Sequence, residues 1–304
     1  MSSVSMDITE RQKLNGSIED NIKAEVILDS ISPTGYRLTT MEVTFHRFIL
    51  PEFNTHRSFS RNSASSRAIP LGKTLERVAG NPAFAVSWPR EQRGMQGGED
   101  LFGQALQDAQ DLVSDLHEYT TKRIEDYITE HPEKSDRLHK SVINRYLEPF
   151  SWHTVIVSAT EWDNFWEQRC SSLAQPEIRV PAEKMRIAYE VSTPVEVGHD
   201  SWHTPYILSE EYEELSLKAR KAVSAARCAR VSYLTHDGLR DINKDIDLYN
   251  RLVTAVPAHF SPLEHVAKPA VISQHAPGNF VSWQQHRHEV ESMISRGEQV
   301  AIWS

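Results

Sequence analysis

The residues best suited to chemistry lie in one short run, residues 54–70, which reads NTHRSFSRNSASSRAIP. Three arginines, one histidine, two asparagines and six hydroxyl side chains crowd into it. Guanidinium groups bind phosphate oxygens in pairs, and hydroxyls occupy the remaining acceptor positions. The run therefore predicts an anion cradle, with a solvated loop of alternating polarity as the alternative. Its expected members are Arg57, Ser60, Arg61, Asn62, Ser63, Ser65, Ser66 and Arg67.

Strands and helices must position this run. Residues 24–28 and 41–50 are rich in β-branched and apolar side chains and predict strands, the second of which leads directly into the run. Apolar residues recur at helical spacing over residues 101–130, and further helices are expected over 134–146, 181–191, 210–229 and 241–253. Residues 154–169 predict a short strand or a helix start that leads into an amphipathic helix. Because strands and helices do not alternate regularly as βαβ units, the pattern indicates an α+β fold with an antiparallel or mixed sheet. We expect a flexible tail over residues 1–22 and one catalytic domain over residues 23–304.

Charge and composition limit the function. The chain of 304 residues carries a formal net charge of −9, which argues against binding nucleic acid or an anionic membrane. A basic pocket in an acidic protein suits a small phosphorylated ligand better. No apolar run is long enough to span a membrane, and two cysteines provide no disulfide framework. We therefore expect a cytoplasmic protein.

Other reactive groups are weaker candidates. His286 and His288 are two residues apart on an expected helix, so their imidazoles point to different faces, and we expect no metal site. Ser65 lacks the GxSxG surroundings of a nucleophile and suits anion binding better. Arg169 could lower the pKa of the adjacent Cys170, although an inert thiol is favoured.

Three sequence blocks resemble the flavin-dependent thymidylate synthases. The spacing of Arg57, seven residues and Ser65 is similar to that family's Arg-His-Arg-x7-Ser signature, and Asn62 and Arg67 extend the agreement. NRYLEP at 144–149 and SATEWDNFWEQRCSSLAQPEIR from residue 158 resemble its second block. AARCARVSY (225–233) and HFSPLEH (259–265) resemble motifs that normally precede the signature, so the motif order looks circularly rearranged.

The chain also departs from the family pattern. Thr55 stands in place of the first signature arginine, and Ser63 in place of a glutamate. Ser158, Thr160 and Leu173 replace an asparagine, an arginine and a histidine. The resemblance is therefore weakest for flavin geometry and for the choice of pyrimidine base.

The resemblance implies reductive methylation of dUMP to dTMP, with FAD as cofactor and methylenetetrahydrofolate and NADPH as co-substrates. It also implies a homotetramer. It places Arg169 and Ser65 as catalytic residues, and Arg67, Arg145, Arg169, Ser65 and Ser63 on the pyrimidine deoxynucleoside monophosphate. The implied flavin contacts are His56, Arg57, Asn62, Asn164, Ser232, Ser261 and Glu264.

Two alternatives stay open from the sequence. One is a related flavin enzyme that methylates or hydroxymethylates another pyrimidine nucleotide such as dCMP, which the Ser63 departure favours. The other is a non-catalytic nucleotide-binding or RNA-binding protein that uses the arginine and serine run.

Overall fold

The computed structural model describes residues 18–231, 241–270 and 278–302. Its centre is a five-stranded mixed sheet in the order β3-β4-β2-β1-β5, in which only the short β1–β5 pair is parallel. A small antiparallel pair, β6–β7, lies beside it. The strands are β1 Lys23–Ile31, β2 Arg37–His46, β3 Ser60–Ser63, β4 Trp152–Ala159, β5 Val195–Glu196, β6 Ala267–Pro269 and β7 Trp283–Gln285.

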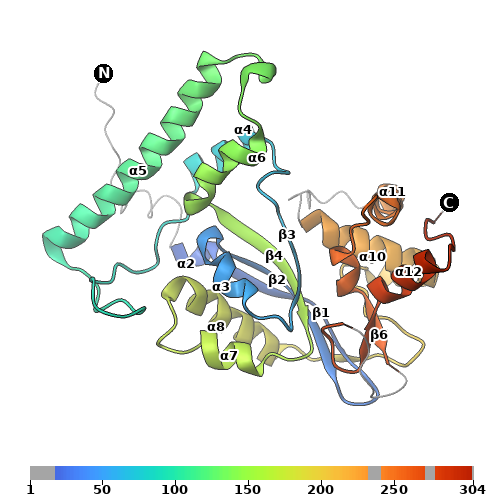
Figure 1. Ribbon diagram of the computed structural model, residues 1–304. Helices are drawn as coiled ribbons and strands as arrows, with labels where there is room; N and C mark the ends of the chain where they lie inside the picture. The colour runs from blue at the N-terminus through green and yellow to red at the C-terminus, as the bar shows by residue number, and fades with distance from the viewer. Residues whose placement is uncertain (1–17, 232–240, 271–277, 303–304) are drawn as a thin grey trace.

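Helices form three groups around this sheet (Figure 1). The first group lies against one face of the sheet and contains α3 Leu50–Asn54, α7 Asp163–Arg169 and α8 Pro176–Val191. The second contains α4 Leu71–Gly80, α5 Gly103–Glu130, α6 Lys140–Ile143 and η3 Asn144–Phe150. The third contains α10 Leu217–Val231, α11 Ile242–Thr254, η4 Ser261–His265 and α12 His286–Ser295. Short elements complete the chain: α2 Ile18–Asn21, η1 Arg47–Ile49, η2 Lys134–Asp136 and α9 Ser209–Glu214.

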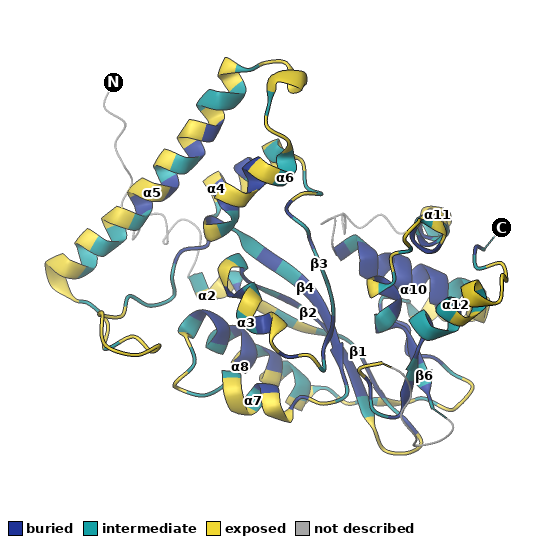
Figure 2. Cartoon of the chain, viewed as in Figure 1, coloured by how far each residue is buried: buried dark blue, intermediate teal, exposed yellow. Residues whose placement is uncertain are grey.

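Alternation along β2 and β4 explains how the sheet divides the protein. Met41 and Val43 pair with Val157 and Val155, and all four pack into the core beneath α8. Thr40 and Ser158, on the opposite face, are joined by a hydrogen bond of 2.6 Å. Side chains of successive strand residues point to opposite faces, so an apolar face supports α8 while a polar face meets the third helix group. Figure 2 shows that α10 is buried along most of its length.

The structure confirms the α+β fold and corrects several boundaries. Residues 47–50, expected to end the strand over 41–50, instead form η1 and the start of α3, because Pro51 ends the extended run and favours the first turn of a helix. The expected helix over 134–146 is broken into η2, α6 and η3, and the one over 210–229 is split into α9 and α10. Residues 18–22, assigned to the tail, pack onto the fold through buried Ile22, whereas residues 1–17 lie outside the described part.

Candidate active site

The polar run does not form one open cradle, because its centre is the edge strand β3. Ser60 pairs with Ser158 and Ser63 with Val155 of β4. The Ser60 hydroxyl is buried and accepts a hydrogen bond of 2.9 Å from Nε2 of Gln285. Strand pairing and the bond from Gln285 thus give Ser60 a structural role, and its part in anion binding stays a prediction.

Arg61 also has a structural role. Its Nη1 donates to the backbone carbonyls of Phe53 (3.2 Å) and His56 (3.1 Å). Burial lowers the Arg61 pKa, and the charge of Glu264 opposes that shift in part. Arg61 thus holds the α3 segment against β3 through Nη1, and its part in the cradle stays a prediction.

His56 and Arg169 form the first cluster of predicted site residues. Nε of Arg169, at the end of α7, donates to Nε2 of His56 at 2.9 Å, and its Nη2 lies 3.2 Å from Oγ1 of Thr55. Burial lowers the His56 pKa to about 4, and the charges of Arg169 and Arg61 add to this. His56 is therefore neutral near pH 7 and accepts through Nε2. Thr55, which departs from the signature, accepts a hydrogen bond from Nη2 of Arg169.

Asn62 forms the second cluster, which joins the signature run to the two displaced motifs. Its Nδ2 donates to the carbonyl of Cys228 in α10 at 2.9 Å, across 166 residues of sequence. Its Oδ1 accepts from Oγ of Ser261 in η4 at 3.3 Å, across 199 residues. Chain segments that are remote in sequence therefore meet at β3.

Glu264, also in η4, is held beside this cluster. Its Oε1 accepts from Nη1 of Arg287 at 2.6 Å, and its carbonyl accepts from Nε2 of Gln285 at 3.0 Å. Gln285 therefore bridges η4 and Ser60 of β3. Sequence reasoning missed Gln285, because the only signal there was the polar WQQHRH segment, whose histidines drew attention to metal binding instead.

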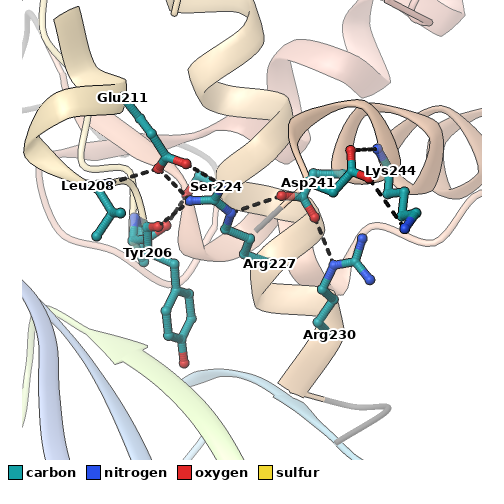
Figure 3. Close-up of polar contacts among 10 residues, drawn as sticks. Tyr206, Leu208, Glu211, Ser224, Arg227, Arg230, Asp241 and Lys244 are labelled. Atoms are coloured by element: carbon teal, nitrogen blue, oxygen red, sulfur yellow. Dashed lines mark hydrogen bonds and ion pairs between the residues drawn. The ribbon is translucent and has the colours of Figure 1, made fainter. Parts of the chain in front are cut away.

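A buried ionic network fixes α10, which carries the first displaced motif (Figure 3). Arg227 donates to both carboxylate oxygens of Glu211 at 2.6 Å and to Asp245 at 2.9 Å. Arg230 donates to the other oxygen of Asp245 at 2.7 Å. Burial lowers the Arg227 pKa, but its hydrogen bonds to both carboxylates outweigh burial and raise it overall. The arginines of the AARCARVSY motif thus anchor the helix.

The other predicted site residues are more exposed or only half-buried. Arg57, Arg67 and Asn164 are exposed, and Ser63 and Ser65 are half-buried. Arg145 is exposed and forms an ion pair with Glu148 at 3.1 Å. Glu148 is not one of the hydrogen-bond partners of Arg169. Ser232 lies outside the described residues.

The positions that depart from the family's flavin contacts have internal partners. Ser158 is fully buried and is hydrogen-bonded to Thr40 and to Nδ1 of His265 at 2.9 Å. Oγ1 of Thr160 accepts from the amide of Val281 at 3.0 Å. Leu173 is exposed. Ser158 therefore holds η4 of the third helix group through His265, and Thr160 holds the segment that precedes β7.

The remaining candidate groups are accounted for by local contacts. His286 is buried, with Nδ1 2.7 Å from Glu289 and Nε2 3.1 Å from the Tyr249 hydroxyl. No group of three or more histidine, cysteine or acidic side chains that could hold a metal occurs within the described ranges. Burial raises the Cys170 pKa, which agrees with an inert thiol.

Comparison with known proteins defines the class. The profile of the family described as thymidylate synthase complementing protein (Thy1) matches residues 29–195, more than half of the chain. The chain belongs to this family, the flavin-dependent thymidylate synthase family. It is accordingly a methyltransferase enzyme of the thymidylate synthase type, whose reaction is the methylation of a pyrimidine nucleotide. This assignment favours an enzyme over a non-catalytic binding protein.

Among solved structures, the chain resembles a UMP/dUMP methylase, PolB from Streptomyces cacaoi, crystallised with 5-Br UMP. The identity is 13%, the match covers 55% of this chain and 88% of PolB, and the TM-score is 0.41. A search of curated proteins found no match. Within the described residues, none of the helices has the length and apolar character to cross a bilayer.

Proposed function

We propose that this enzyme reductively methylates dUMP to dTMP, with FAD as cofactor and methylenetetrahydrofolate and NADPH as co-substrates. We further propose that its motif order is circularly rearranged, that it is a cytoplasmic homotetramer, and that it binds no nucleic acid. Family membership supports the reaction class. The substrate, the cofactors and the roles of individual residues are our inference.

The contact between Asn62 and Ser261 carries this proposal. The profile match ends at residue 195, yet η4 and α10 both meet the signature strand through Asn62. A rearranged chain that keeps the family's site must return these motifs to the signature, and this contact agrees with that requirement. Because the three segments meet in space, the site does not depend on their order in sequence.

The donor set near Asn62 and His56 fits a flavin. Neutral side chains can hydrogen-bond to the nitrogens and carbonyl oxygens of its ring system, and His56, Asn62 and Ser261 are of this kind. The exposed cation Arg57 suits its diphosphate. We assign Asn164, Ser232 and Glu264 to the same cofactor. A bound flavin would supply the reducing electrons that turn the transferred one-carbon unit into a methyl group.

Arg169 suits the nucleotide. Its Nε and Nη2 are held by His56 and Thr55, whereas Nη1 has no hydrogen-bond partner within the described residues. A guanidinium held through two of its nitrogens can donate a hydrogen bond from the third, Nη1, to a pyrimidine ring on which negative charge develops. Arg67 and Arg145 would hold the phosphate, together with Ser63 and Ser65.

A tritium-release assay tests the reaction. Methylation at carbon 5 must displace the hydrogen there, so dUMP labelled with tritium at carbon 5 should release label into water. We expect release that requires FAD, NADPH and methylenetetrahydrofolate together, with dTMP as the product. Release from labelled dCMP but not dUMP would instead favour the alternative substrate, which the serine at position 63 supports.

Arg169→Lys is expected to lower kcat/KM by about 100-fold, because a lysine cannot both keep the His56 contact and point a second donor at the ring. Steady-state tritium release measures this. Arg123→Lys is the matched control, since Arg123 is exposed on α5 and pairs with Asp126 at the surface. Equal losses of kcat/KM in both variants would show that Arg169 does not act at the nucleotide site.

Ser261→Ala is expected to weaken FAD binding about fivefold, the loss of one hydrogen bond of about 1 kcal/mol. Titration of the cofactor-free protein with FAD, followed by flavin fluorescence, measures the Kd. Ser135→Ala, in the exposed η2 turn, controls for loss of a surface hydroxyl. An unchanged Kd for Ser261→Ala would show that Ser261 of η4 does not bind the flavin.

A further inference from the structure

The long helix α5 is apolar on two opposite faces, and it lies at the edge of the molecule (Figure 1). Its inner face packs Ile124 and Ile128 against α4 and η3. Its outer face carries Leu112, Leu116 and Tyr119, which are 60%, 51% and 67% exposed. With 3.6 residues in each turn, these side chains point roughly away from Ile128. A helix that is apolar all round is normally covered all round, and the described part of the chain covers only the inner face.

The outer face has the spacing of a seam along which two helices pair. Its members follow one another at steps of four, three, four and three residues: Ala105, Ala109, Leu112, Leu116 and Tyr119. Alternating steps of three and four keep side chains in one stripe, the pattern by which helices pack side by side. None of the five is buried, and exposed residues recur along α5 (Figure 2). A contiguous apolar stripe in water marks an interaction site.

The seam is complementary to itself when two copies of α5 run antiparallel. With a two-fold axis between Leu112 and Leu116, Leu112 of one copy faces the partner's Leu116. The same register sets Tyr119 against the partner's Ala109. Large side chains opposite small ones fill the space between two helices without voids. In a parallel pair each residue would instead face its own copy, and the two Tyr119 rings would collide while the alanines left a gap.

Charge beside the seam has the same symmetry. Asp108 and Lys122 lie 14 residues apart, about 21 Å along the helix. In the antiparallel register each Asp108 carboxylate lies opposite the partner's Lys122 ammonium, once on each side of the axis. Asp108 accepts from the neutral amide of Gln104 at 2.8 Å and pairs with no cation within the described residues. Lys122 pairs with Asp126 at 2.9 Å, but an exposed pair of this kind contributes little.

We propose that two copies of this chain associate through the outer faces of their α5 helices, antiparallel, about a two-fold axis between Leu112 and Leu116. The apolar seam forms the centre of the contact, and the pairs of Asp108 with the partner's Lys122 form its rim. A two-fold contact uses the same surface on both copies, so one self-complementary seam suffices. This contact is one interface of the homotetramer proposed above, and it rests on that proposal for any copy beyond the second.

Sedimentation velocity of the purified protein, without FAD, NADPH or methylenetetrahydrofolate, tests the pairing. Leu116→Glu places a carboxylate from each copy in the apolar centre, so we expect the Kd for association to rise at least about 100-fold. Ile294→Glu is the matched control, because Ile294 is an exposed apolar residue of α12, remote from α5 in the sequence. The control variant should keep the wild-type mass.

A charge exchange tests the antiparallel register. Asp108→Lys and Lys122→Asp each set like charges opposite each other on both sides of the axis, and each should weaken association about tenfold. The double variant restores opposite charges across the axis and should recover most of the wild-type Kd. Within one helix the two side chains are separated by more than the screening length of physiological salt, so this recovery cannot arise inside a single chain.

Three results would overturn the proposal. The first is a wild-type protein that stays monomeric at micromolar concentration. The second is an association that Leu116→Glu leaves unchanged, or that Ile294→Glu weakens equally. The third is a double charge variant that recovers nothing, which would exclude the antiparallel register. Circular dichroism and thermal melting of each variant separate loss of association from loss of fold. Flavin binding is measured separately, so a protein that pairs through α5 but binds no flavin would contradict the proposed reaction and not this inference.

Discussion

Lowering the pH from 7 to 5 is expected to destabilise this protein by several kcal/mol. The cause is a set of buried neutral histidines. Burial lowers the pKa of His203, His265 and His153 to about 3, and the Arg47 charge adds to the shift at His153. His203 bridges Ser30 and Thr40 across the polar face of the sheet.

The sign follows from proton uptake. Below pH 6.5 the unfolded chain protonates these histidines while the folded chain does not, so the free energy of unfolding falls as the pH falls towards 3. At pH 5 each histidine contributes a loss of about 2 kcal/mol. Three such losses are comparable with the total stability of a typical domain, about 5–15 kcal/mol.

Urea denaturation between pH 7.5 and pH 5 measures this slope. His203→Gln should flatten it, since glutamine has no proton to take up, even though the variant starts from lower stability. His199→Gln, at an exposed position, controls for removal of an imidazole. A midpoint that stays constant from pH 7 to pH 5 would contradict the assignment of neutral buried histidines.

Replacing Arg227 with methionine is expected to reduce the free energy of unfolding by about 3–5 kcal/mol. Arg227 donates to both carboxylate oxygens of Glu211 and to Asp245, and Asp245 keeps Arg230 when Arg227 is lost. The variant removes a buried cation that faces two buried carboxylates, and the loss of this charge costs more than the lost hydrogen bonds. Chemical denaturation at pH 7.5 gives the change.

Arg186→Met provides the matched control, because Arg186 pairs with Glu190 at the surface, where both side chains are about half exposed. Exposed ion pairs contribute little to stability. In a second variant, Glu211→Gln combined with Arg227→Met should recover part of the loss by removing the negative charge that faced Arg227. A loss no larger than that of Arg186→Met would show that the network does not anchor α10.

The spacing of apolar residues correctly predicted the helices and strands whose two faces differ most in polarity. The helix expected over 101–130 is α5, and the strand over 24–28 lies within β1, because long amphipathic patterns and β-branched runs leave little choice of structure. β3 was missed, since SRNS has no apolar alternation and becomes a strand only by pairing with β4. Tertiary pairing of this kind leaves no local signal.

The candidate site was predictable in its residue types but not in its grouping. Resemblance placed Asn62 and Ser261 together, and the structure joins them. It assigned His56 and Arg169 to different ligands, although they contact each other directly. The structural role of Arg61 was not predictable, because residue type alone does not reveal that backbone carbonyls of α3 and its following turn accept hydrogen bonds from its Nη1.

The most direct test of the proposed function is the reoxidation of reduced flavin. The purified protein is loaded with FAD, reduced without oxygen, and mixed with methylenetetrahydrofolate and either dUMP or dCMP, while the visible spectrum is recorded. We expect the oxidised flavin spectrum to return with dUMP only, together with one dTMP per flavin. Return of the oxidised flavin spectrum with dCMP only would mean that dCMP is the substrate in place of dUMP. A protein that cannot be loaded with flavin would contradict the proposed cofactor site at His56, Asn62 and Ser261.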